Sequence, residues 1–74
     1  MFNELGTVVL TRDVEEHGLR KGDVGAIVHA YANADAYEVE FLTADGTTIS
    51  VETLSGSDIR AMTGHEILNV RQVA

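Results

Sequence analysis

Hydrophobic and polar residues alternate most regularly over residues 37–42. The apolar residues of this stretch fall on one side of the alternation, and Glu38 and Glu40 fall on the other. The apolar side comprises Tyr37, Val39 and Phe41. A period of two residues is typical of a strand with one buried face and one face in water. The pattern therefore predicts a half-buried β-strand with an acidic outer face.

Other short apolar runs, rich in β-branched residues and separated by turn-forming residues, predict further strands. The predicted strands are residues 7–11, 24–31, 37–42, 47–53 and 59–62, with one short 3₁₀ turn within residues 54–59. Asp45-Gly46 is a hairpin signal between the third and fourth of them. Five short strands at this spacing predict an all-β fold, a small five-stranded antiparallel barrel.

Two of these strands carry more specific predictions. Gly25 lies early in the second strand, where a glycine often marks a bulge or a bend. In the fourth strand, alternation predicts that Ile49 and Val51 face the core.

Two segments lie outside the predicted strands. Residues 12–22 form a long loop, and its Val14 and Leu19 are predicted to fold back onto the core. The tail, from about residue 65 to residue 74, fits neither a period of two nor a period of 3.6, and we expect an extended segment. A chain end usually frays unless it is docked, so the apolar residues of the tail predict packing on its own barrel or contact with a partner.

Length and composition narrow the class of protein. A chain of 74 residues is predicted to form one domain, residues 1–74. With no cysteine, no signal-like N-terminus and no apolar run of about 20 residues, the sequence favours a cytoplasmic protein that does not enter a membrane. Five basic residues against 12 acidic ones, a net charge of −7, disfavour nucleic acid and favour a basic protein partner.

Several groups of residues together form a recognisable pattern. They are Val8-Val9-Leu10-Thr11-Arg12-Asp13, Glu16-His17-Gly18-Leu19, Lys21-Gly22-Asp23-Val24-Gly25, Tyr37-Glu38-Val39-Glu40-Phe41, Asp45-Gly46 and Glu66-Ile67-Leu68-Asn69-Val70-Arg71. This pattern resembles that of the bacterial family DUF4926. The resemblance covers nearly the whole chain and implies an SH3-like barrel, similar to that of the nitrile hydratase β subunit. It implies no catalytic residue. It also suggests a small protein encoded beside a larger partner, which it binds in an antitoxin-like manner.

The histidines are candidate metal ligands. His17, His29 and His65 lie on a predicted loop, a strand and the tail, without the close spacing of zinc motifs. Glu15, Glu16 and His17 could hold a cation only loosely, since neighbouring loop residues rarely converge on one ion. Solvated loop polarity is the simpler interpretation, and the sequence predicts no metal site.

Glu38 and Glu40 also invite a catalytic interpretation. Side chains two apart on a strand are separated by roughly 7 Å, within the about 5–9.5 Å that glycoside hydrolases use. That chemistry needs one carboxyl group in a pocket with a raised pKa, and a small barrel offers no deep cleft. Gly22-Asp23-Val24-Gly25 lacks the ending of a phosphate-binding loop. We therefore predict no enzymatic activity and no cofactor.

The prediction that remains is a protein-binding module. Tyr31 and Tyr37 could form an aromatic shelf for an extended peptide, although core packing explains Tyr37 equally well. The predicted partner-binding residues are Glu15, Glu16, His17, Tyr31, Glu38 and Glu40. The alternative is a structural protein that forms a homodimer through its tail, because strand edges are templates for pairing. An enzyme, the third class, would need a pocket with at least two perturbed titratable groups.

Overall fold

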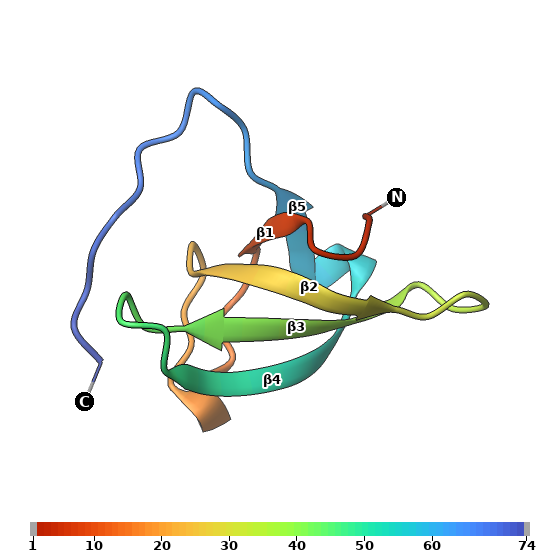
Figure 1. Ribbon diagram of the computed structural model, residues 1–74, viewed down its shortest axis with the longest axis horizontal. Coiled ribbons are helices and arrows are strands. Elements are labelled where there is room, and N and C mark those ends of the chain that lie inside the picture. The colour runs from red at the N-terminus through yellow and green to blue at the C-terminus, as the bar shows by residue number, and fades with distance from the viewer. Residues whose placement is uncertain (1, 74) are drawn as a thin grey trace.

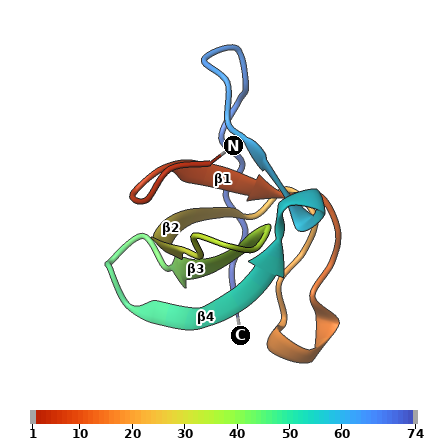
Figure 2. The same ribbon diagram turned by 90° about the vertical axis from the view of Figure 1, so that its right-hand side faces the viewer.

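Five antiparallel strands form one sheet in the computed structural model, which describes residues 2–73 (Figure 1). The strands are β1 (Thr7–Leu10), β2 (Val24–Ala30), β3 (Ala36–Leu42), β4 (Thr48–Ser55) and β5 (Ile59–Ala61), with two 3₁₀ turns, η1 (Glu15–His17) and η2 (Gly56–Asp58). This confirms the all-β, five-stranded antiparallel prediction. The strand order is β4-β3-β2-β1-β5, and β4 and β5 do not pair within residues 2–73, so the sheet curls without closing (Figure 2).

The core lies inside the curl of this sheet. β3 contributes its alternating apolar residues, and η1 lies in the loop that follows β1. Val14 and Leu19 of that loop are each 2% exposed, which confirms that both fold back onto the core. They also form an isolated antiparallel bridge that closes the loop. The core cluster consists of Val8, Leu10, Val14, Leu19, Ile27, Tyr37, Val39, Phe41, Leu54 and Ile59.

The irregularity of β2 lies at a different residue from the one predicted. The register against β3 shifts between Ile27 and His29, whereas Gly25 pairs with Val8 in regular register, so the bulge lies elsewhere and the bend at Gly25 stays a prediction. Gly25 serves close packing instead. A Cβ atom there would lie 2.7 Å from Cγ1 of Val39 and 2.9 Å from Cε1 of Phe41, so the core closes over the missing side chain.

The face of β4 that meets the core is the opposite of the predicted one. Val51 pairs with Glu40 on the outer face and is 49% exposed, and Ile49 is 37% exposed, so neither residue is buried. A strand whose register is offset by one residue turns every side chain to the other face. Glu52 consequently points inward, where its carboxylate lies 3.3 Å from Nε2 of His17. The imidazole of the loop gives this inward carboxylate a polar partner.

The C-terminal segment, residues 62–73, forms neither helix nor strand and arcs away from β5 along the outside of the molecule (Figure 1). Side chains hold it at two points. Arg60 donates two hydrogen bonds to the carboxylate of Glu66, at 2.8 and 2.5 Å. Arg71 donates two hydrogen bonds to the carboxylate of Asp23, at 2.9 and 2.5 Å, and a third to the carbonyl of Gly18. We call residues 62–73 the strap.

The strap covers one apolar residue on the outside of the sheet. Val9 lies between two core residues of β1 and therefore points to the opposite face. It is nevertheless only 4% exposed, in a hollow that it shares with Met62 and Leu68 of the strap. The strap thus takes part in burial, although Ile67 and Val70 remain 95% and 93% exposed. None of the helical turns in residues 2–73 has the length and apolar character that a membrane span requires.

Candidate binding surface

Two carboxylates stand side by side on the outer face of β3. Glu38 and Glu40 alternate with the buried residues of the strand and point away from the core. Thr53 donates a 2.7 Å hydrogen bond to Oε2 of Glu38, and Thr48 donates one of the same length to Oε2 of Glu40. Both hydroxyl donors lie on β4, so both carboxylates are drawn toward that strand.

Tyr31 completes this surface from the end of β2. Its hydroxyl donates to Oε2 of Glu38 at 2.5 Å, and its ring meets that of His29 edge-on, with centroids 4.7 Å apart. The hydrogen bonds from Thr53 and Tyr31 hold the pKa of Glu38 below its ordinary value. The same bond raises the pKa of Tyr31, because the carboxylate retains the phenol proton. We call Tyr31, Glu38, Glu40, Thr48 and Thr53 the acidic face.

The cations of the chain lie elsewhere. No lysine or arginine occurs between Lys21 and Arg60, a stretch that contains β2, β3 and β4. Three of the five cations form ion pairs away from the acidic face: Arg12 with Asp58, Arg60 with Glu66 and Arg71 with Asp23. Among residues 2–73, the ion pairs include neither Glu38 nor Glu40. The acidic face therefore keeps its negative charge uncompensated by lysine or arginine.

The other predicted binding residues lie on a different surface. Glu15 and Glu16 are exposed in η1, and His17 contacts Glu52 on the inward side of β4. Glu38 lies on the outward side of the neighbouring strand. The structure thus brings Tyr31, Glu38 and Glu40 together, but it separates them from the tip of the loop.

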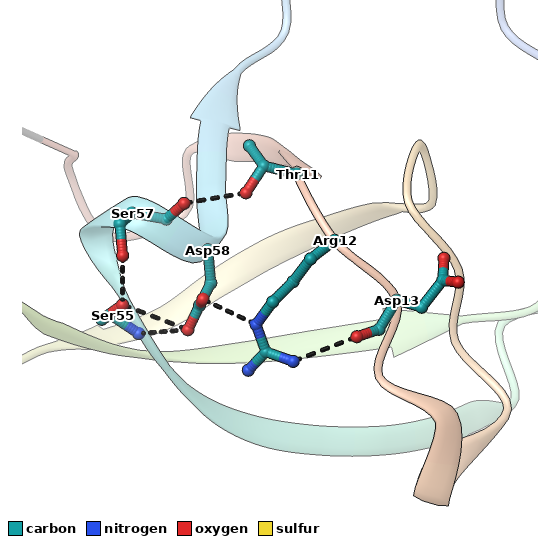
Figure 3. Close-up of polar contacts among 6 residues, drawn as sticks. All are labelled: Thr11, Arg12, Asp13, Ser55, Ser57 and Asp58. Atoms are coloured by element: carbon teal, nitrogen blue, oxygen red, sulfur yellow. Dashed lines mark hydrogen bonds and ion pairs between the residues drawn. The ribbon is translucent and has the colours of Figure 1, made fainter.

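The loop that carries η1 is fixed at its base to η2 (Figure 3). Nε of Arg12 donates to Asp58 at 2.7 Å, and the hydroxyl of Thr11 donates to the carbonyl of Ser57 at 2.8 Å. The Asp58 carboxylate also accepts from the backbone N–H of Ser55, while the Ser55 hydroxyl oxygen accepts from the backbone N–H of Asp58, and these two bonds form a capping box. The bond from Arg12 lowers the pKa of Asp58. The cluster positions the loop and, like the contact of His17, is internal to the fold.

Sequence reasoning missed the residues that shape these surfaces. Thr48 and Thr53 sit in the predicted fourth strand, where two hydroxyls next to a glutamate-bearing strand could have signalled contact across the sheet. The ion pair between Arg71 and Asp23 could not be predicted from the local sequence around either residue. The three histidines lie apart: one contacts Glu52, another lies 3.3 Å from the carboxylate of Glu4, and the third is in the strap. Within residues 2–73, no group of three metal-ligating side chains gathers at one point.

The chain matches a known protein family. The family described as a domain of unknown function, DUF4926, matches residues 4–61, which include all five strands. The chain belongs to the DUF4926 family. The match ends at Ala61 with the last strand, so the resemblance of residues 66–71 is not part of it. The acidic face and η1 fall within the DUF4926 region, and the strap lies outside it. No curated protein and no solved structure matches the chain.

Proposed function

We propose that this DUF4926 protein is a non-enzymatic protein-binding module whose acidic face recognises a basic partner. The observation that carries the proposal is the pair of carboxylates, Glu38 and Glu40, on a three-stranded surface without lysine or arginine. Such a surface attracts a positively charged protein at long range and rejects an acidic one.

The hydrogen bonding at Glu38 supports binding over a role as a general acid. A lowered pKa keeps this carboxylate charged at neutral pH, whereas a general acid needs a raised one. Two hydroxyl groups fix the position of this ionised carboxylate, so it is preorganised to accept a charge-assisted hydrogen bond from lysine or arginine. We further propose that the partner is a larger protein encoded nearby, which this chain binds in an antitoxin-like manner.

The tip of the loop, Glu15, Glu16 and His17, is a separate part of the proposal. Its two exposed glutamates lie in η1 and form a second negative surface. This surface is on the other side of β4 from the acidic face. A partner on the acidic face has to wrap around the edge of the sheet to reach this tip. We therefore assign the principal contact to the acidic face and a peripheral one to the tip.

Charge reversal tests this assignment with a matched control. Glu38→Lys/Glu40→Lys changes the net charge from −7 to −3, and Glu15→Lys/Glu16→Lys changes it equally on the other surface. The protein that co-purifies from the native host is purified and titrated against both variants at two salt concentrations. We expect at least a tenfold loss of affinity and a weaker salt dependence for the first variant, and a small loss for the second. Unchanged affinity and salt dependence in the first variant would contradict the proposal.

A second candidate function is self-association through the strap. Ile67 and Val70 are almost fully exposed, and no backbone hydrogen bond joins residues 62–73 to the rest of the described chain. Pairing two straps across a two-fold axis would bury these residues and form a homodimer. Light scattering should show a dimer that Ile67→Ser/Val70→Ser converts to monomer, while Val28→Ser, an exposed valine of β2, leaves it intact. A monomeric wild-type protein at high concentration would exclude this function.

A further inference from the structure

β4 is an edge strand, and the backbone N–H and C=O groups on its edge away from β3 are available for pairing. It stands at one end of the strand order and, among the described strands, pairs with β3 alone. No hydrogen bond to backbone outside the β3 ladder involves residues 48–54 in the described structure. Proteins usually protect such an edge with lysine, proline, a short strand or a covering segment. β4 is eight residues long and contains neither lysine nor proline.

The outer face of this edge strand has a polar–apolar–polar order. Thr53 faces Glu38 and Val51 faces Glu40 across the ladder, and Thr48 lies at the other end. The register shift beside Phe41 lets five residues of β4 oppose four of β3. The two threonine hydroxyls draw the carboxylates toward the edge, one on each side of the exposed Val51.

We infer that the free edge of β4 receives an extended basic segment of the partner as an added strand. This inference rests on the proposed function and states how the partner binds. Side chains two apart on the added strand share a face. A basic residue would therefore lie beside Thr53, an apolar residue beside Val51, and a second basic residue beside Thr48. The segment has the pattern basic–x–apolar–x–basic.

The dimensions of a sheet allow these contacts. An added strand lies about 4.8 Å from β4 and so about 10 Å from β3. Lysine and arginine stems extend along a surface while their charged groups reach a polar partner. Glu38 and Glu40 lean toward β4, which shortens the gap that a cation has to cross. Backbone pairing supplies affinity, and the two carboxylates fix the register of the added strand.

Synthetic peptides test the inference on the intact protein. The probe is acetylated and amidated Thr-Lys-Thr-Val-Thr-Lys-Thr, and the charge control carries glutamate in place of both lysines. Two further peptides are N-methylated at complementary sets of alternate residues, so that one set blocks the edge facing β4 and the other leaves it free. Binding is followed by the backbone amide signals of the ¹⁵N-labelled protein.

We expect the lysine peptide to shift the amide signals of β4 and the glutamate peptide to bind at least tenfold more weakly. One methylated peptide should lose binding and the other should keep it, and Glu38→Gln/Glu40→Gln should weaken the lysine peptide tenfold or more. Equal binding of both methylated peptides, shifts that avoid β4, or no binding at millimolar peptide would overturn the inference. If Glu38→Lys/Glu40→Lys still abolishes binding of the natural partner in those cases, the acidic-face proposal stands without the added strand.

Discussion

Replacing Gly25 with alanine would put a methyl group into the tightest part of the core. The new Cβ would lie 2.7 Å from Cγ1 of Val39, 2.9 Å from Cε1 of Phe41 and 3.0 Å from the carbonyl oxygen of Glu40. Carbon atoms pack best at about 3.5–4.0 Å. Val39 and Phe41 are buried and cannot swing aside, and the carbonyl belongs to the ladder.

The expected cost follows from these overlaps. An extra methyl group in a well-packed core costs about 1–3 kcal/mol. Alanine regains about 0.5–1 kcal/mol, because glycine loses more backbone freedom on folding. The difference between these two ranges is about 0–2.5 kcal/mol, and because three atoms are overlapped we expect Gly25→Ala to fall in its middle and upper part, lowering the free energy of unfolding by about 1–2 kcal/mol. For a domain of this size, that corresponds to a fall in Tm of roughly 4–16 °C.

Urea titration and calorimetry measure this change, and Gly64→Ala is the matched control. A Cβ at Gly64 meets nothing within 4 Å, and this strap glycine has no positive φ. The control should stay within about 0.5 kcal/mol of the wild type. If Gly25→Ala is as stable as the control, the side chains of β3 do not pack as closely on Gly25 as these distances indicate.

Three further predictions concern β4 and the strap. Leu54→Ala should cost about 2–5 kcal/mol in urea titration, while Val51→Ala on the outer face should cost far less; equal costs would contradict the assigned faces. The hydrogen bonds from Arg60 lower the pKa of Glu66 from 4.5 to about 2, so their stabilising effect is complete above pH 4.5 and is lost as the pH falls toward 2. Glu66→Gln should accordingly lose less stability than the wild type between pH 6 and 2.5, and parallel losses would argue against this ion pair. Arg71→Ala should release the end of the strap, seen as lower heteronuclear NOE values for its amides; unchanged values would show that other contacts hold it.

The sequence predicts those parts of the fold in which local pattern and burial agree. β3 is the clearest case, because Tyr37, Val39 and Phe41 all meet one core and the glutamates between them meet water. The phase of β4 was not predictable in this way. It depends on the hairpin register and on the contact between Glu52 and His17, two residues from distant parts of the chain. The inward face of β4 carries the buried Leu54 and also Glu52, whose partner His17 is not evident from hydrophobicity alone.

The candidate site was predictable in its residue types but not in its arrangement. Alternation places Glu38 and Glu40 on one face, and Tyr31 is the last residue of the predicted strand 24–31. That Tyr31 donates to Glu38 depends on how β2 and β3 pair around their register shift. The separation of Glu16 from this group depends on which side of the sheet the long loop covers. Both are tertiary facts that no local window of sequence contains.

The distribution of charge keeps the two proposed interactions apart. Arg60 and Arg71 hold the strap through ion pairs with Glu66 and Asp23, so neither of these cations neutralises the acidic face. Burial of Asp23 acts to raise its pKa, but the hydrogen bonds from Arg71 and from the Arg20 N–H lower it below the ordinary value. A partner on Glu38 and Glu40 need not displace the strap, since the strap lies against β1, β5, the loop base and the end of the β3–β4 hairpin, and none of its hydrogen bonds involves either glutamate. Dimerisation through Ile67 and Val70 would therefore leave both acidic faces open, and one dimer could bind two partners.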